Sequence, residues 1–337
     1  MGIKAYLGGN TEVIYAPGYY VPEKPKTFDT NWQEKSLEEQ EEEKAAQREK
    51  EKLLIHEQNV RLFEEALRAA KEADEVIFVG GLNHDFDSEG LDRADMKLPY
   101  EQDMLIEELL KVRKDVIITL IGGSPVEMPW RHHAETILWS YYAGMETGNA
   151  FAEILFGEVN PSGKLAETFP ARYEDCVTAK NGQSGIQGSI SLSERFYFGY
   201  RYFDKERIAP AFCFGHGLSY TQFAYSNLSL KQEKDGTGAL KVSFSIKNTG
   251  KKAGAEVVQL YVAPIAPKVE RPAKELKSFA KVKLQPGKSE KITLTLTHQD
   301  FAYFDSDKHD FTVNSGDYEI LVGTSSEDIR LKGLYTL

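Results

Sequence analysis

The chain has 337 residues, of which 41% are hydrophobic, and it carries a formal net charge of −11 with an isoelectric point near 5.3. This hydrophobic content suffices to bury a core and excludes global disorder. The length suggests two domains, because single cores rarely grow beyond about 250–300 residues. The acidic balance argues against nucleic acid or a membrane surface as a partner, since both attract basic faces.

The two cysteines, Cys176 and Cys213, lack a CxxC spacing and are predicted to be ordinary buried residues, not a disulfide framework or a metal site. The sequence contains no run of 18 apolar residues, so it predicts no membrane-spanning helix. The first residues, 1–4, have no signal-peptide core. We therefore expect a reducing, cytoplasmic setting.

The first two thirds of the chain alternate between helical and strand-like patterns. Residues 36–73 predict one long helix, whose first part, 37–52, is almost wholly charged and should form a solvated face or a projecting arm. The second part carries an apolar stripe at spacings of three and four residues, formed by Val60, Phe63, Leu67 and Ala70. A coiled coil is the alternative interpretation of this helix.

Three nearly continuous apolar runs lie in the same part of the chain. We expect strands over residues 75–82, 115–121 and 136–141, and helices over about 100–114 and 150–156. Continuous apolar strands are buried on both faces, as in a parallel sheet that helices cover. The sequence therefore predicts a doubly wound α/β sandwich.

The pattern changes after about residue 223, where apolar and polar residues alternate with period two. Segments 240–246, 256–262 and 291–296 show this alternation, and turn signals separate them. Short alternating strands predict an antiparallel β-sandwich. We therefore expect an α/β sandwich domain over residues 1–221, with the candidate site, and an all-β sandwich over residues 222–337.

A dense group of ionisable side chains follows the first predicted strand. Ligands of open parallel sheets bind beyond the carboxyl ends of the strands, so the loop 83–93 is the leading candidate site. Its crowded carboxylates repel one another, which favours the protonated form that a general acid needs. Gly90 allows the backbone to turn sharply beside Glu89 and to present that side chain.

Other interpretations of the polar residues stay open at this point. The loop 83–93 is also compatible with a solvated acidic loop, or with a cation site built from Asp85, Asp87 and Asp92, although it lacks the spacing of an EF-hand. A metal site formed by His132, His133 and Glu135 is disfavoured, because adjacent helical residues point about 100° apart. The glycine pairs after the strands do not form GxGxxG, so we expect no nucleotide, no metal and no other cofactor.

An aromatic cluster at residues 196–203 precedes the predicted β-sandwich. Such rings stack on sugars, and they also pack between domains. Because the cluster adjoins the predicted sandwich, interdomain packing is the favoured interpretation.

Residues 87–93 (DSEGLDR), with Leu98, Pro99 and Gln102 after them, resemble the acid/base loop of glycoside hydrolase family 3 β-glucosidases. The resemblance continues in GSPVEMPW at 123–130, YAGMETG at 142–148, LFGEVNPSGKL at 155–165, FGYRYFD at 198–204, FGHGLSYT at 214–221, RPAKELK at 271–277 and LQPGK at 284–288. These blocks follow the family order over nearly the whole chain.

This resemblance implies a catalytic (β/α)8 barrel, an α/β sandwich and a fibronectin type III-like domain, of which the last two match the predicted domains. It implies that Glu89 is the general acid/base, and that Asp92 and Arg93 brace its loop as an ion pair. The family's nucleophile is an aspartate in a Ser/Thr-Asp-Trp context on the barrel, and no such context occurs in this sequence. The nearest strings contain Asp305 and Asp317, both in the predicted β-sandwich.

The expected function is hydrolysis of terminal non-reducing β-D-glucosyl residues with retention of configuration. A nucleophile-bearing barrel, on a separate subunit or a missing N-terminal half, would complete the enzyme. The alternatives are a β-xylosidase of the same family and a non-catalytic carbohydrate-binding or assembly module that has lost its barrel. Residues 2–7 predict a helix, near which we expect an apolar docking surface for the missing half.

Overall fold

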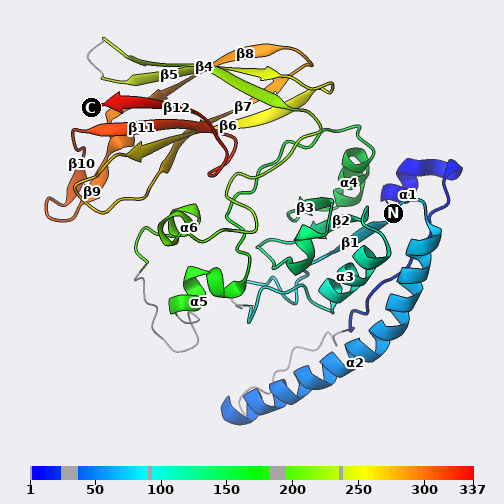
Figure 1. Cartoon of the computed structure of the whole chain (residues 1–337). Coiled ribbons are helices and arrows are strands. Elements are labelled where there is room, and N and C mark those ends of the chain that lie inside the picture. Colours follow the sequence, from blue (N-terminus) through cyan, green and yellow to red (C-terminus); the bar gives the residue numbers. More distant parts are fainter. Residues whose placement is uncertain (1, 24–36, 90–92, 182–193, 235–237) are drawn as a thin grey trace. The chain divides into compact units, whose positions relative to one another are not determined.

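The computed structural model describes residues 2–23, 37–89, 93–181, 194–234 and 238–337, without the side chains of residues 37–44 and 181. The chain divides into two compact units, Met1–Ala150 and Phe151–Leu337, whose ribbons are drawn in Figure 1. Within the described part of the chain, no helix is long and apolar enough to cross a membrane.

The first unit is built around a parallel sheet. Its elements are α1 (Gly2–Leu7), η1 (Gly8–Asn10), α2 (Leu37–Glu72), β1 (Ile77–Gly81), α3 (Gln102–Val112), β2 (Ile117–Ile121), η2 (Pro129–His132) and β3 (Thr136–Ser140), and α4 (Thr147–Leu155) spans its boundary. The strands pair in parallel in the order β1-β2-β3, in a register that joins Ile77 to Ile117 and Ile117 to Thr136. The three predicted strands, and the short helix predicted at residues 2–7, are confirmed.

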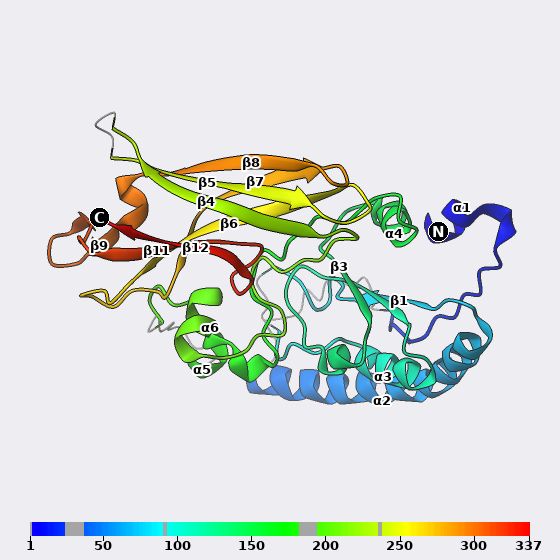
Figure 2. The ribbon, with the colours of Figure 1, turned by 45° about the horizontal axis from the view of Figure 1, so that its top comes forward.

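Apolar burial explains why these runs form a sheet covered by helices. The side chains of Ile118 and Leu120 on β2 and of Ile106 on α3 are fully buried, and Figure 2 shows α2 and α3 side by side along one face of the sheet. The predicted α/β class is confirmed. The three described strands follow chain order without the reversal that double winding requires, so that detail stays a prediction.

The buried face of α2 differs from the predicted stripe. Its buried side chains are Ile55, Asn59, Leu62, Ala66 and Ala70. Val60 is 53% exposed, and Phe63 and Leu67 are only half-buried. The helix carries apolar residues on two adjacent faces, and the face with small alanines is the one that packs. The prediction of a solvated arm is confirmed for residues 45–50, whose side chains are exposed.

The second unit contains the β-sandwich and the segment that leads into it. Its elements are η3 (Tyr173–Asp175), α5 (Val177–Asn181), α6 (Tyr200–Glu206), β4 (Phe223–Gln232), β5 (Leu240–Asn248), β6 (Gly254–Pro264), β7 (Glu275–Leu284), β8 (Ser289–Leu296), η4 (His298–Phe301), β9 (Tyr303–Asp305), β10 (Asp310–Thr312), β11 (Asp317–Gly323) and β12 (Ile329–Thr336). One sheet has the order β12-β11-β6-β7, another has the order β4-β5-β8, and β9 and β10 form a hairpin.

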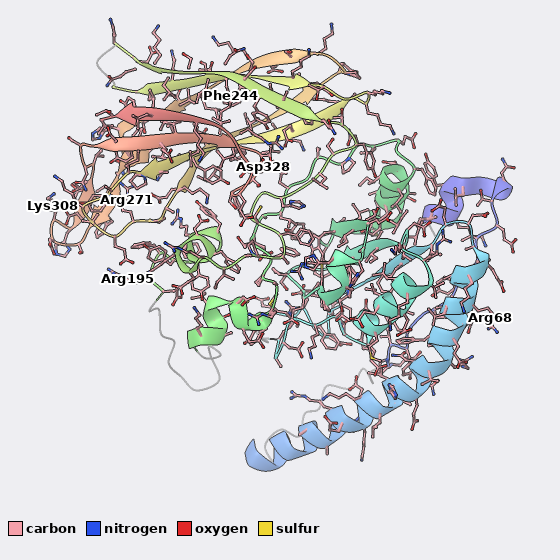
Figure 3. All side chains as sticks on the ribbon, viewed as in Figure 1. Arg68, Arg195, Phe244, Arg271, Lys308 and Asp328 are labelled. Carbon is pink, nitrogen blue, oxygen red and sulfur yellow. The ribbon has the colours of Figure 1, made fainter. Side chains whose placement is uncertain are left out.

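Alternation with period two produces the sandwich core. Along β5, Leu240, Val242, Phe244 and Ile246 are at most 1% exposed, while the residues between them face outward. They pack in one cluster with Leu260 and other residues of the facing sheet, and Figure 3 labels Phe244 within it. The predicted antiparallel sandwich is confirmed.

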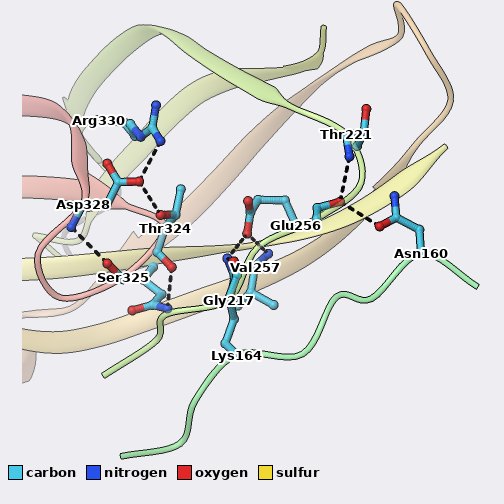
Figure 4. A network of polar contacts seen from close by, with 12 residues as sticks. Asn160, Lys164, Gly217, Thr221, Glu256, Val257, Thr324, Ser325, Asp328 and Arg330 are labelled. Carbon is cyan, nitrogen blue, oxygen red and sulfur yellow. Dashed lines mark hydrogen bonds and ion pairs between the residues drawn. The ribbon is translucent and has the colours of Figure 1, made fainter. Parts of the chain in front are cut away.

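The segment 151–222 packs onto the sandwich through buried polar contacts. Lys164 forms an ion pair of 2.9 Å with Glu256 on β6, and both side chains are nearly buried. The Asn160 carboxamide accepts hydrogen bonds from the Tyr220 N–H and the Ser219 hydroxyl; Figure 4 shows this region. These contacts explain why the compact unit begins at residue 151. The predicted domain boundary between residues 221 and 222 stays a prediction.

The aromatic cluster takes part in the same packing. Tyr197, Tyr202 and Phe203 are buried together, and the Tyr200 ring meets Tyr261 of β6 edge-on at 5.9 Å. A buried arginine continues this seam, because Arg271 donates to the Phe301 carbonyl and pairs with Glu275 at 3.1 Å. These contacts support the packing interpretation of the aromatic run.

Candidate active site

The candidate loop begins where β1 ends. Gly81 has φ +129°, and a Cβ there would lie 1.9 Å from the Ile121 carbonyl oxygen, so only glycine fits this close approach. The next residue, Leu82, donates its N–H to the same carbonyl at 2.7 Å. Residues 83–89 then leave the carboxyl end of the sheet as a series of turns. The loop therefore starts from a rigid point.

A buried glutamine fixes the end of β1 from its outer side. The Gln102 side chain accepts from the Gly81 N–H at 2.7 Å and donates to the Gly81 carbonyl at 2.9 Å. Gln102 is fully buried at the start of α3. Its carboxamide thus replaces a neighbouring peptide group and holds the point from which the loop departs.

Asp87 anchors the middle of the loop to the ends of the other two strands. Its Oδ2 accepts from the Gly123 N–H at 2.7 Å, after β2, and from the Tyr142 hydroxyl at 3.0 Å, after β3. Its Oδ1 accepts from the Ser124 hydroxyl at 3.3 Å. Hydrogen bonds to an ionised carboxylate are stronger than neutral ones. One side chain therefore joins the loops that follow all three strands.

Two features adapt the neighbours of Asp87 to this contact. A Cβ on Gly123 would lie 2.6 Å from Asp87 Oδ2 and 3.0 Å from the Tyr142 ring, so the absence of a side chain makes room for the carboxylate. Partial burial and the hydrogen bond with Asp87 raise the pKa of Tyr142 to about 12. The Tyr142 hydroxyl consequently stays protonated at neutral pH and can donate.

A second set of contacts supports the first half of the loop. The Tyr100 hydroxyl donates to Asp85 at 3.2 Å and accepts from the Asn83 carboxamide at 2.9 Å, while Phe86 meets the Tyr100 ring edge-on. Burial is the main cause that raises the pKa of Tyr100, so its hydroxyl also remains a donor. Asp85 and Asp87 are thus held by different partners.

The turn that carries Tyr100 has an unusual backbone. Tyr100 and Glu101 have φ values of 59° and 61°, in the left-handed region that non-glycine residues rarely adopt. The buried Asn59 of α2 compensates, because its carboxamide donates to the Tyr100 carbonyl at 2.9 Å and to Glu101 Oε2 at 3.0 Å. Two consecutive strained residues beside a candidate site are typical of functional positions.

The predicted acid/base, Glu89, lies two residues beyond Asp87 with an exposed side chain in a turn. Gly90 and Asp92 lie outside the described residues, so the structure does not address the predicted ion pair of Asp92 with Arg93. Arg93 itself donates to the Pro125 carbonyl at 2.6 Å, after β2. Hydrogen bonds therefore hold the chain before Glu89, at Asp87, and after it, at Arg93.

A buried carboxyl supports the chain that returns from the loop. Asp103 accepts from the Leu98 N–H at 3.1 Å and from the Trp130 indole N–H at 2.8 Å. Burial raises the pKa of Asp103 to about 6, although both hydrogen bonds lower it. Leu98 and Trp130 belong to segments that the resemblance singled out, and this carboxyl links them.

The remaining sequence candidates lie elsewhere. Asp305 is on β9 and pairs with Lys308 at 3.1 Å, which holds the pKa of Asp305 below its usual range. Asp317 is on β11 and accepts from the Thr336 hydroxyl at 2.6 Å. Both belong to the β-sandwich unit, with structural partners. His132 and His133 are exposed at the end of η2. Neither Cys176 nor Cys213 forms a disulfide among the described residues; Cys213 is buried as predicted, whereas Cys176 is only half-buried.

Comparison with known families fits this arrangement. Residues 3–220 match the glycosyl hydrolase family 3 C-terminal domain. The chain belongs to this family. Residues 256–326 also match a fibronectin type III-like domain, in the β-sandwich. The family assignment and the fold class predicted from the sequence are therefore confirmed.

Curated relatives of this glycoside hydrolase family 3 chain are β-glucosidases. It is 44% identical over 272 residues to thermostable β-glucosidase B of Acetivibrio thermocellus, a match that covers 80% of the chain and 36% of that protein. It is 40% identical to a β-glucosidase of Rhizobium radiobacter, over 79% of the chain and 33% of that protein. The chain therefore spans about a third of the length of these relatives.

Solved structures of β-glucosidases are similar to this chain as well. The crystal structure of a β-glucosidase from Kluyveromyces marxianus in complex with glucose matches with a TM-score of 0.79 and 36% identity, over 83% of the chain and 33% of that protein. A β-glucosidase from Bifidobacterium adolescentis matches with a TM-score of 0.78 and 38% identity, over 82% of the chain and 41% of that protein. This family likeness extends to both sequence and fold.

Sequence reasoning found the loop but not the residues that hold it. The contacts of Asp87 with Gly123 and Tyr142 join positions 36 and 55 residues apart, and the clamp formed by Gln102 was equally unforeseen. A usable signal existed, because polar or glycine residues directly follow each predicted strand, and the carboxyl ends of parallel strands meet at one edge.

Proposed function

We propose that this chain supplies the general acid/base of a retaining β-glucosidase, and that Glu89 is that residue. The observation that carries the proposal is the loop itself: Glu89 is exposed at the carboxyl end of a parallel sheet, two residues from an aspartate that ties its loop to all three strands. A proton donor needs a mobile proton and a fixed position, and this arrangement provides an accessible carboxyl on an anchored loop.

The chemistry requires a second carboxylate that this chain does not offer in a recognisable setting. We infer that a nucleophile on a (β/α)8 barrel, from a separate subunit or from a polypeptide continuous with this chain, completes the site. Retaining enzymes hold the two carboxyl groups about 5–5.5 Å apart. Asp305 and Asp317, which lie in the strings nearest to the nucleophile's context, have structural partners in the β-sandwich.

Glu89 would act twice in each turnover. In the first step the nucleophile bonds to the anomeric carbon while the glycosidic C–O bond breaks, and Glu89 gives its proton to the departing oxygen. In the second step a water oxygen displaces the nucleophile, and the Glu89 carboxylate takes a proton from that water. The sugar leaves with its configuration retained, and Glu89 is protonated again.

The proposed substrate is a terminal non-reducing β-D-glucosyl unit. The β-glucosidase names of the relatives and the glucose complex of the Kluyveromyces marxianus enzyme support this choice over a β-xyloside. An uncharged substrate also suits the acidic balance of the chain. The cytoplasmic setting stays a prediction.

The test uses a hybrid enzyme in which this chain replaces the matched C-terminal part of Acetivibrio thermocellus β-glucosidase B. Glu89→Gln in the hybrid should lower turnover of alkyl β-glucosides by about 10²–10⁴-fold, the usual contribution of general acid–base catalysis. With a good leaving group such as dinitrophenol, the first step needs no proton, and added azide should restore the second step and yield β-glucosyl azide.

The matched control is Glu64→Gln, which changes another exposed glutamate, on α2 and outside the loops that follow the strands. It should leave all rates unchanged. Equal losses on both substrate classes without rescue by azide would remove Glu89 from the acid/base role.

A further inference from the structure

The outer edge of β1 presents backbone groups that β2 does not use. The Ile117 N–H donates to the Val76 carbonyl, and the Leu82 N–H donates to the Ile121 carbonyl. Along a strand, the backbone N–H and C=O groups of successive residues point alternately to its two sides. The backbone groups of Val76, Phe78, Gly80 and Leu82 therefore point towards β2. The N–H and C=O groups of Ile77, Val79 and Gly81 consequently face away from it.

The side chain of Gln102 satisfies only the last of these three residues. It accepts from the Gly81 N–H and donates to the Gly81 carbonyl. Among the described residues, β1 pairs with β2 alone. Within the described part of the chain, Ile77 and Val79 therefore lie on an open edge, although native proteins usually cover or protect such an edge.

A groove runs along this open edge. It has a volume of about 470 Å³ and lies between β1 and the extended segment 14–19. Alanines of α2, among them Ala66 and Ala70, and the α3 residues Leu105 and Leu109 also line it. One wall of the groove offers small and apolar side chains, and the other offers the outward-facing peptide groups of β1. An extended peptide segment could bind between them.

The apolar surface around the groove is also uncovered. Val79 is 49% exposed, Ile14 is 49% exposed and Tyr15 is 81% exposed. A soluble protein rarely leaves such residues exposed together beside an unpaired strand edge unless something binds there. The groove therefore has the chemistry of an interface.

We propose that this groove binds one extended, apolar segment of the barrel-bearing polypeptide as a fourth strand beside β1. The inference rests on the proposed function, because it identifies where the partner of that function attaches. The incoming strand exchanges hydrogen bonds with Ile77 and Val79 and is buried on both faces, which calls for a short run rich in valine and isoleucine.

The shape of the groove favours this occupant over a second copy of the chain. The segment 14–19 forms the wall of the groove opposite β1, so the groove has room for a single strand. The β1 edge of a second copy belongs to a whole sheet, which would not fit between these walls. The relatives supply the source of the strand, because about two thirds of their length lies outside the part that this chain matches.

The experiment measures backbone amide hydrogen exchange of the full chain, resolved to single residues. The probe is the part of Acetivibrio thermocellus β-glucosidase B that precedes its matched region, added as a separate polypeptide. In the chain alone, the amides of Ile77 and Val79 should exchange about 10-fold or more faster than those of Phe78 and Gly80. The probe should slow Ile77 and Val79 by about 10-fold or more.

Two variants test the groove directly. Val79→Pro removes one open-edge N–H without touching the ladder with β2, a position where sheets accept proline, and Val79→Lys places a charge in the apolar rim. Each should weaken binding of the probe by about 10-fold or more. The matched control, Val60→Lys, changes a valine that is 53% exposed on α2 and does not line the groove, and it should bind the probe normally.

Turnover of an aryl β-glucoside, read in the same mixtures, separates this inference from the proposed function. Protection of Ile77 and Val79 without turnover would support the groove and contradict the function. Turnover without that protection, or equal binding by Val79→Lys and the original chain, would overturn the groove. The absence of binding would overturn it as well, and so would protection that depends on the concentration of the chain alone, since that result identifies a second copy as the occupant.

Discussion

The two compact units of this chain use polar and apolar groups in opposite ways. In the β-sandwich unit, the core residues of β5 and β6 are almost fully buried, and buried ions such as Lys164 and Glu256 find partners inside the unit. In the first unit, the Glu89 side chain is exposed, and among the described residues the outer edge of β1 pairs with no other strand. The buried charges of Lys164 and Glu256 in the second unit are thus paired inside the chain, whereas the first unit presents the carboxyl that we propose acts on a substrate and the strand edge that we propose binds a partner.

This difference separates positions that serve stability from positions that serve function. A change in the sandwich should alter the free energy of unfolding, and a change in the loop after β1 should alter catalysis in the assembled enzyme with little effect on folding.

The largest effect is expected from removal of the sandwich. A chain that ends at Tyr220 loses the surface on which the segment 151–220 packs, including the partners of Lys164 and Tyr200. This segment should lose its fixed structure, and the truncated chain should bind a hydrophobic dye or aggregate. A soluble monomer with the melting temperature of the full chain would show that the segment does not depend on the sandwich.

The next largest effect concerns the buried ion pair in Figure 4. Lys164→Met leaves the carboxylate of Glu256 buried without its partner and should cost about 3–5 kcal/mol of unfolding free energy. The double variant Lys164→Met with Glu256→Leu should recover much of that loss, because two apolar side chains replace two charges. Urea denaturation of the four proteins gives the coupling energy, and additive losses would contradict the paired arrangement.

A smaller effect is expected for the anchor of the loop. Asp87→Asn weakens three hydrogen bonds to a charged acceptor, which should cost about 1.5–3 kcal/mol of transition-state stabilisation, or roughly 10–100-fold in kcat. KM should change little, and azide should not rescue the loss, because Glu89 is still present. Tyr142→Phe removes one donor and should have a weaker effect. An unchanged kcat for Asp87→Asn would show that the loop needs no anchor.

The smallest effect is a pH dependence of stability within the first unit. Burial raises the pKa of Asp103 from 3.8 to about 6. The unfolded state therefore releases this proton first as the pH rises, so the free energy of unfolding should fall between about pH 4 and pH 6 and then level off, by an amount on the order of 3 kcal/mol. Asp103→Asn should abolish this slope in urea denaturation curves. An identical slope in the variant would assign the effect to other groups.

The sequence predicted the strands whose residues form a continuous apolar run or a regular alternation. The runs at 77–81, 117–121 and 136–140 contain so little polar character that a buried strand is the natural outcome, and the alternation along 240–248 leaves one face for the core. The buried face of α2 could not be predicted in this way. Apolar residues occupy two of its faces, and only tertiary contact selects the face with Ala66 and Ala70.

The candidate site shows the same limit. Density of charge and family resemblance led to the loop and to Glu89, but the anchoring role of Asp87 depends on two other loops that parallel pairing brings to the same edge. The clamp between Gln102 and Gly81 likewise requires the start of α3 to lie beside the end of β1. Such contacts depend on which strands and helices lie side by side in the fold. The local pattern of residues along the chain does not state this order directly.

The most direct test is an aryl β-glucoside assay of the purified chain, alone and together with the part of Acetivibrio thermocellus β-glucosidase B that precedes its matched region, where we propose that the barrel lies. A general acid can donate a proton but cannot form the covalent intermediate, so the chain alone should show no turnover above background. Addition of the barrel polypeptide should produce turnover that Glu89→Gln removes for alkyl glucosides. Robust turnover by the chain alone would contradict the account, since it would require a nucleophile within these 337 residues.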